Sequence, residues 1–291
     1  MKRFALLALL VVACGAAHAQ TLSLAYKSGA THKYNLHSTA DEAMNMGAIA
    51  IPVKFELAGA ETVTVKSVDS AGNADLSISL SNLTMKSTTG TVTNTTTGMP
   101  SPAIDMKVAS DGRIVSINGT SLGGNPFSAF SPTGGGGFIS AVLPDNAVKP
   151  GDTWSKDYDQ ASTMGAGSIH VVTKSKYLRD ESLQGVNAAV VQTTSTAAYD
   201  LTIDLSKLAA GAGAQAPAVP PGMLQGITVK GTSTSDVTSW IDPNGHRVMK
   251  THMTGTTDAN LNVGAASGGA MTGLPGSFTI QGKETTDLTP A

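Results

Sequence analysis

The chain has 291 residues, of which 14% are charged and 4% are aromatic, and its formal net charge is −2. Without the two basic residues of its first three positions, 17 basic side chains stand against 21 acidic ones. This balance excludes a basic surface for nucleic acid or for an anionic membrane. The single cysteine excludes an internal disulfide framework, so burial of a core must provide the stability.

Residues 1–19 have the pattern of an export signal peptide. Lys2 and Arg3 form a basic start, residues 4–13 are an apolar run, and Ala17 and Ala19 frame a cleavage site. The run is too short for a mature membrane-spanning helix, and no later stretch is long and apolar enough for one. We therefore expect an exported protein of the periplasm, the cell envelope or the extracellular space.

Two processing routes are open for Cys14. Residues 11–14, Val-Val-Ala-Cys, resemble a bacterial lipobox, which would make Cys14 an acylated first residue and a membrane anchor. Alternatively, the leader is cut after Ala19 and the cysteine is lost with it.

After the leader, short segments that alternate apolar and polar residues predict β-strands. A slip in this alternation predicts a bulge near Ser81 and Asn82. Residues 86–101 are rich in threonine and predict a flexible loop. The predicted strands of the first half are residues 29–37, 52–58, 61–68, 73–80, 104–108 and 113–117.

The second half continues the pattern, with an interruption at residues 204–225. Leu205, Leu208 and Ala209 predict one or two helical turns there, before a tract of Ala, Gly and Pro. Residues 264–276 predict a loop of small residues. The predicted strands of this half are residues 168–178, 186–196, 227–241, 247–262 and 277–288.

Turn residues link several of these segments. Asp69 and Gly72 frame one predicted tight turn, and Gly112 ends a second. In the third, Asp242-Pro-Asn-Gly245, we expect a type I turn with a positive φ at Gly245, a three-residue hairpin loop.

The fold class that follows is all-β with few short helices. We predict a strongly curved antiparallel sheet or incomplete β-barrel of about ten to eleven strands. Residues 20–291 would form one domain built from two diverged half repeats, at about 22–120 and 143–288, joined by a linker at 121–142. The alternative is that similar hairpins recur by chance.

Two segments resemble known exported proteins. Trp240-Ile-Asp-Pro-x-Gly-x-x-Val248 resembles a hairpin of the lipoprotein-localisation carrier proteins, and residues 143–158 resemble secreted bacterial proteins with a Pro-Gly-Asp-Thr-Trp signature. The carrier resemblance implies an unclosed antiparallel barrel whose apolar hollow holds acyl chains. The long helix that follows the leader in those carriers is missing here.

Side chains that could line such a hollow are apolar residues in or beside predicted strands. Methionine adapts to irregular apolar guests, although it also serves as ordinary core filling. Residues 127–142 and 204–224 would be lids over the hollow or plain crossovers. The candidate ligand-binding residues are Phe55, Leu57, Met106, Met249 and Met253.

No pattern predicts catalysis, a metal site or a cofactor. His246 and His252 would share a strand face, but zinc needs three or four converging ligands. No nucleophile elbow occurs, and the scarcity of aromatic residues argues against a sugar-binding cleft. We expect a non-enzymatic binding protein for a lipid or other hydrophobic ligand. The alternative is a structural or protein-interaction module of the envelope.

The processing prediction is tested by labelling cells with a clickable fatty acid. If the lipobox is used, the wild-type protein incorporates the label and Cys14→Ser does not. Absence of label from both, with a mature protein that starts after Ala19, contradicts acylation.

Overall fold

The protein, seen in a computed structural model, is built of β-strands. The structure describes residues 19–98, 103–118, 139–161, 165–203, 227–263 and 276–291, and within them it has twelve strands and no helix. No helix among these residues could cross a membrane. The strands are β1 (Thr31–Met46), β2 (Ile49–Val68), β3 (Ala74–Thr89), β4 (Val92–Thr97), β5 (Ile104–Val108), β6 (Ile114–Asn118), β7 (Thr153–Ala161), β8 (Gly165–Leu183), β9 (Val186–Ile203), β10 (Ile227–Asp242), β11 (Arg247–Val263) and β12 (Ser277–Pro290).

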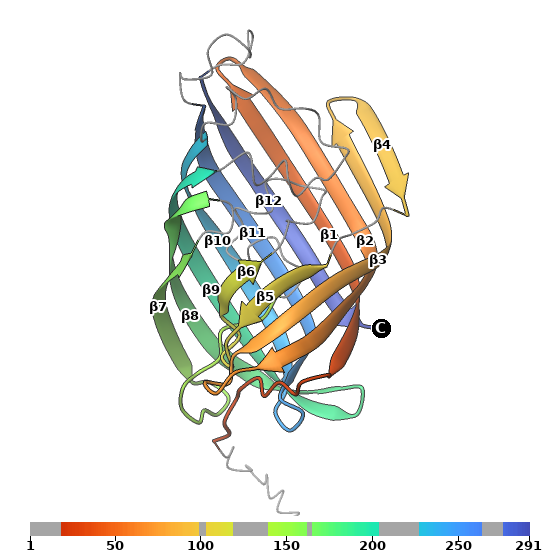
Figure 1. The fold of residues 1–291 in the computed structure, drawn as a ribbon, viewed down its shortest axis with the longest axis vertical. Coiled ribbons are helices and arrows are strands. Elements are labelled where there is room, and N and C mark those ends of the chain that lie inside the picture. The colour runs from red at the N-terminus through yellow and green to blue at the C-terminus, as the bar shows by residue number, and fades with distance from the viewer. Residues whose placement is uncertain (1–18, 99–102, 119–138, 162–164, 204–226, 264–275) are drawn as a thin grey trace, which may run out of the picture.

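Eleven strands form one nearly closed antiparallel barrel in the order β6-β5-β3-β2-β1-β12-β11-β10-β9-β8-β7, and β4 pairs only with β3. The path ends at β6 and β7, so no ladder of backbone hydrogen bonds joins these two strands. We call this break in the barrel the seam. Figure 1 shows β8–β12, β1 and β2 as a tall curved wall, with β5 and β6 lying in front of it. The predicted incomplete β-barrel is confirmed.

Alternating side chains explain the curvature. Along β9, Val191, Ala197 and Leu201 are buried inside the barrel, whereas Thr194 and Thr196 are exposed on its outside. The inward side chains bury apolar surface, and the outward hydroxyl and charged groups keep contact with water. One inner apolar face and one hydrated outer face favour a sheet that curls onto itself.

The lower end of the barrel, drawn at the bottom of Figure 1, contains the larger apolar cluster. Leu22 and Leu24 lie in it, close to the tight turns that connect the strands there. Backbone hydrogen bonds hold these early residues in place, because Leu24 N donates to Ser110 O and Ala25 N donates to His246 O. Residues 22–25 are thus tied into the core.

The hairpin at residues 242–247 differs from the prediction. Asp242 pairs with Arg247, which leaves a four-residue loop instead of three, and the positive φ of 50° belongs to His246. The Asp242 carboxylate accepts hydrogen bonds from the N–H groups of Asn244 and Gly245. A Cβ at Gly245 would lie 2.3 Å from that carboxylate, so glycine is required for this close approach.

The threonine-rich stretch after β3 is also corrected. Residues 86–89 end β3, Gly90 turns the chain with a φ of 59°, and β4 pairs back onto β3. Threonine favours strands, and this propensity outweighs the absence of apolar alternation. The bulge is confirmed, since the β2–β3 register shifts there and Asn82 has a φ of 54°.

Several predictions concern residues outside the described ranges. These are the leader with Cys14, the helical turns near Leu205, the tract at 210–222, most of the loop at 264–276 and most of the linker at 121–142. The half repeats stay a prediction. The strand order is compatible with them. The strands of the first half lie around the barrel in the reverse of their chain order, β6-β5-β3-β2-β1, and five strands of the second half do the same, β11-β10-β9-β8-β7.

Glu61 is an exception to the apolar core. It is fully buried on the inner face of β2, opposite Tyr34 of β1 and Leu80 of β3. Neither carboxyl oxygen has a hydrogen-bond partner in the part of the chain that is described. Burial raises the pKa of Glu61 well above its usual value of 4.5, so the protonated form is favoured.

Replacing Glu61 with glutamine tests this pKa shift. Glu61 loses its proton at a lower pH in the unfolded chain than in the folded protein. Below about pH 4.5 the group is protonated in both states and does not oppose folding. As the pH rises above this value, the free energy of unfolding falls, because only the unfolded chain can readily release the proton. Glu61→Gln should therefore be more stable than wild type at pH 8. The difference should shrink at pH 4, as measured by urea denaturation.

The control is Glu56→Gln on the outer face of the same strand. A hydrogen bond from Lys86 lowers the pKa of Glu56, so this variant should gain no stability at pH 8. A loss of stability in Glu61→Gln at pH 8 would show that the buried carboxylate is ionised and paired.

Candidate functional site

The upper half of the barrel has an apolar inner wall. Its buried residues come from β8–β12, and we call them the upper cluster: Ile169, Val171, Ala197, Tyr199, Leu201, Val229, Ala259, Leu261 and Ile280. Tyr158 and Phe278 pack against them. On the inner face of β1 and β2, Met44, Ile51 and Phe55 are half-buried. Apolar side chains thus line the barrel interior from two sides.

Residues 139–143 cross the inside of the barrel without forming a strand, and we call them the plug. Ile139, Ala141 and Leu143 are buried in the lower core. The plug separates the packed lower end of the barrel from the upper wall.

Hydroxyl groups on four neighbouring strands bind the plug backbone. Ala141 N donates to Ser239 Oγ and Val142 N donates to Thr193 Oγ1, both at 2.9 Å. Ser175 Oγ donates to Val142 O at 3.1 Å, and Thr251 Oγ1 donates to Ile139 O at 3.0 Å. These bonds supply the partners that a buried backbone needs away from water.

A small cavity of about 40 Å³, which we call the chamber, lies between the plug, the seam and the wall. Its polar lining includes Gln160, Ser195 and Ser235, all nearly inaccessible to solvent. Val171 of the upper cluster and Tyr158 also line it. The chamber is therefore polar on one side and continuous with the apolar wall on the other.

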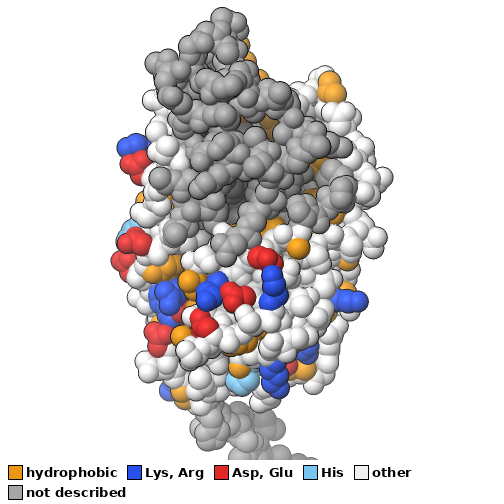
Figure 2. Space-filling view, viewed as in Figure 1, with side chains coloured by type: hydrophobic (Ala, Val, Ile, Leu, Met, Phe, Trp, Pro, Cys, Tyr) orange, Lys and Arg blue, Asp and Glu red, His pale blue; other side chains and the backbone are white. Residues whose placement is uncertain are grey.

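Side chains close the seam where backbone pairing is missing. Lys156 of β7 binds Asp111, which precedes β6, with 2.6 Å between Nζ and Oδ2. Arg113 Nε contacts the same carboxylate at 2.7 Å, and its guanidinium lies 5.0 Å from the ring centre of Tyr158. Figure 2 shows positive and negative side chains gathered on this face of the molecule. The seam is thus held by charge pairs and a cation–π contact.

These contacts are partly shielded from water. The side chains of Lys156 and Asp111 are 12% and 11% exposed, so their pairing is screened less than that of a surface ion pair. Burial acts to raise the pKa of Asp111, but hydrogen bonds from Lys156 and Arg113 outweigh it and hold the pKa below its usual value. Burial raises the pKa of Tyr158 to about 12, so its phenol is protonated at neutral pH.

The five candidate ligand-binding residues do not share one surface. Phe55 and Leu57 are half-buried on the inner face of β2, while Met106 and Met253 lie fully buried in the lower core. Met249 is on the other face of the sheet, in an outer cluster with Trp240. The register between β10 and β11 skips Met249, so this bulged residue turns outward. Phe55 is therefore the candidate best placed beside the upper wall.

The two histidines of the third hairpin do not come together. His246 lies in the turn with Nδ1 3.2 Å from Ser23 O, and His252 is on β11 with Nδ1 2.8 Å from Asp287 Oδ1. The expected shared strand face is wrong, because the four-residue loop takes His246 out of the strand. The described residues contain no group of three metal-ligating side chains.

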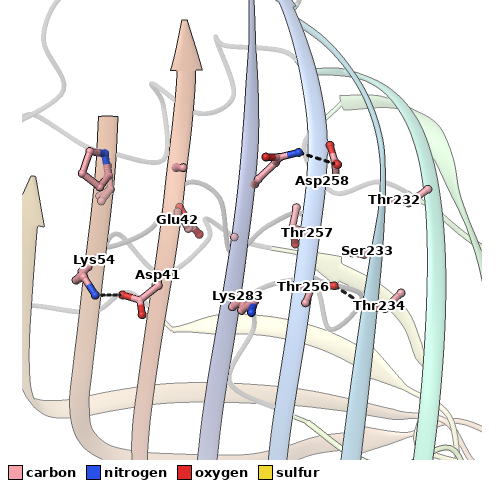
Figure 3. A pocket seen from close by; sticks show the side chains of 15 residues that line it. Asp41, Glu42, Lys54, Thr232, Ser233, Thr234, Thr256, Thr257, Asp258 and Lys283 are labelled. Atoms are coloured by element: carbon pink, nitrogen blue, oxygen red, sulfur yellow. Dashed lines mark hydrogen bonds and ion pairs between the residues drawn. The ribbon is translucent and has the colours of Figure 1, made fainter. Parts of the chain in front are cut away.

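A larger hollow of about 570 Å³ is lined by residues of β2, β1, β12, β11 and β10, among them the buried Ser233. Figure 3 shows Lys54 pointing to Asp41 and Thr256 pointing to Thr234 within it. Several of its exposed side chains are paired with one another, as are Gln281 and Asp258. The inward-facing Glu42, Val53 and Ser233 also line it, so residues of both faces of the sheet border this hollow.

Sequence reasoning missed the plug and the hydroxyls that bind it. The available signal was Ser and Thr at inward positions of otherwise apolar faces, such as Thr193 and Ser195 between Val191 and Ala197. It also missed the Asp111–Lys156 pair, because these residues are 45 positions apart in the chain.

No family model matches the chain, and no curated protein matches it.

Removing one plug contact tests the role of the inner hydroxyls. Thr193→Val keeps the shape of the side chain but leaves the buried N–H of Val142 without its acceptor. The variant should lose about 1–3 kcal/mol of unfolding free energy in urea. Thr194→Val, one residue further on the exposed face, should change it by less than about 0.5 kcal/mol. Equal losses in the two variants would contradict the proposed anchoring.

Proposed function

We propose that this protein is an exported binding protein of the cell envelope that carries a lipid or another hydrophobic small molecule inside its barrel. The observation that carries the proposal is the set of half-buried apolar side chains on the inner face of β1 and β2, Met44, Ile51 and Phe55. An apolar ligand that covers them would remove their remaining exposed surface from water.

The seam supports the same proposal. A fully closed ladder would have to break backbone hydrogen bonds to admit a ligand sideways. Here the two facing strands are joined by the Asp111, Lys156, Arg113 and Tyr158 side chains, which can change rotamer. A ligand could therefore enter between β6 and β7 without breaking backbone hydrogen bonds between strands.

Features of the sequence support export and a hydrophobic cargo. The predicted leader favours export, and the resemblance of the Trp240–Val248 hairpin to lipoprotein-localisation carriers favours a hydrophobic cargo. The outer face is rich in hydroxyl and charged side chains, as expected for a carrier that moves through water with its cargo enclosed.

The second candidate function is a structural or interaction module that has no ligand. Exposed charged side chains on three neighbouring strands favour it, namely Lys54 of β2, Asp41 of β1 and Lys283 of β12. An enzyme is not proposed, since no described group of side chains forms a catalytic arrangement.

Binding of the uncharged fluorescent probe N-phenyl-1-naphthylamine tests the carrier proposal. The wild-type protein should bind the probe and increase its emission. Phe55→Gln makes one inner apolar position polar and should weaken the probe about fivefold or more. Val172→Gln is the control, because Val172 is an exposed apolar residue of β8 with 37% exposure.

Two results would contradict a carrier. One is absence of probe binding together with absence of any co-purifying amphiphile in an organic extract of the native protein. The other is an equal loss of affinity in both variants, which would place the probe on the outer surface. Either result would favour the interaction module.

A further inference from the structure

Two neighbouring hairpins at the upper end of the barrel have no charged residue near their turns. The β1–β2 hairpin turns at residues 47–48, and residues 43–53 are all uncharged. The β3–β4 hairpin turns at residues 90–91, and residues 87–98 are all uncharged. Gly90 N donates to Pro52 O at 3.2 Å, so the two hairpins lie side by side, and Figure 1 shows both turns at the upper end. We call residues 43–53 and 87–98 the tips.

The tips expose large apolar side chains. Ile49 is 62% exposed and Val92 is 60% exposed, whereas the next most exposed large apolar side chain that the structure describes, Val115, is 44% exposed. Ile49 is on the face of β2 that is buried further along, at Val63 and Val65, so this end of the strand projects beyond the core. Apolar side chains gathered in this way on a surface indicate contact with a partner.

Apolar side chains occur on both faces of the β1–β2 tip. The register of the two strands puts apolar residues on each face, namely Met44, Met46, Ile49 and Ile51 inside and Ala43, Ala50 and Pro52 outside. A protein partner covers one side of a hairpin, and the other side then stays polar for contact with water. A lipid bilayer surrounds the hairpin that enters it, so it favours apolar side chains on every side.

The first charged side chains below the turn limit the depth of insertion. Asp41 and Lys54 form an ion pair at 2.9 Å, about 20 Å from the turn along the strands. Elements that lie in a membrane interface reach roughly 5–10 Å into it. Insertion to that depth takes in Met46 and Ile49 and leaves the ion pair in water. The backbone groups of the turn also need polar partners, so the tip would stop at the interface.

The missing charges also indicate the kind of membrane. Clusters of Lys and Arg recognise anionic lipids, and the tips contain neither residue. The side chains of β4 are all exposed, and all except Val92 have a hydroxyl or amide group that can hydrogen-bond to an uncharged or zwitterionic headgroup. A surface without net charge, such as that of phosphatidylcholine, therefore fits the tips better than an anionic one.

From these observations we infer that the two tips insert into the interface of a lipid bilayer whose surface has no net charge, with Ile49 and Val92 as the leading side chains. Contact with a membrane is independent of whether the barrel holds a ligand, so it goes beyond the carrier function proposed above. In a carrier, the same contact would place the upper end of the barrel at the source or the destination of its cargo.

The test uses vesicles of phosphatidylcholine with brominated acyl chains, because bromine quenches tryptophan only at close contact. In Ile49→Trp and in Val92→Trp, the emission of the added tryptophan should shift to shorter wavelength with plain vesicles and be quenched by the brominated ones. Wild-type Trp154 and Trp240 supply the background. Raising the salt concentration about tenfold should leave the quenching unchanged, since no charged side chain of the tips takes part.

Val68 provides the matched control. It is 37% exposed and lies at the opposite end of β2, roughly 60 Å from Ile49 along the strand. The added tryptophan of Val68→Trp should not be quenched. With Val92→Trp as reporter, Ile49→Asp should raise the lipid concentration for half-maximal quenching about tenfold, and Val68→Asp should leave it unchanged. Both positions are exposed, so both variants should fold, and their urea midpoints verify this.

Four results would overturn the membrane contact. They are absence of quenching in Ile49→Trp, equal quenching in Val68→Trp, binding that requires anionic lipid or is lost at high salt, and an emission shift that grows with protein concentration in the absence of lipid. The last result would mean that the tips pack against a second copy of the chain. Each of them leaves the carrier function standing, because binding of N-phenyl-1-naphthylamine tests that function separately.

Discussion

The fold depends on hydrogen bonding of a chain segment that passes through the inside of its own barrel. Ile139 and residues 141–143 are buried, and the N–H groups of Ala141 and Val142 and the carbonyl of Ile139 are paired by Ser239, Thr193 and Thr251. This requirement explains why the inner face of the wall is not uniformly apolar. It also divides the interior, because the plug completes the lower core and leaves the chamber and the upper wall above it.

The plug also positions the seam. Leu143 N donates to Asp111 O at 2.8 Å, and a Cβ at Gly112 would lie 2.9 Å from Ala141 O. Gly112 has a φ of 87°, so glycine satisfies both the turn and this close approach. The Asp111 carboxylate is thereby placed where Lys156 and Arg113 can reach it. Packing inside the barrel and charge pairing at its edge are thus parts of one arrangement.

The sequence predicted local features better than long-range ones. Alternation along residues 73–80 and 186–196 located strands correctly, since period two is a direct consequence of strand geometry. The barrel class followed from strand number and hairpin spacing. The loop length at Asp242 was wrong, because Asp-Pro-Asn-Gly suits more than one hairpin loop. The plug could not be predicted, since its partners Ser239 and Thr251 lie about a hundred residues away.

The central claim is that the inside of the barrel holds an apolar guest. The most direct test is an experimental electron-density map of the protein purified without detergent. The account predicts elongated density that is not part of the chain, lying against the half-buried Ile51 and Phe55 of β2. Protein side chains packed tightly over Ile51 and Phe55, with no such density, would contradict it.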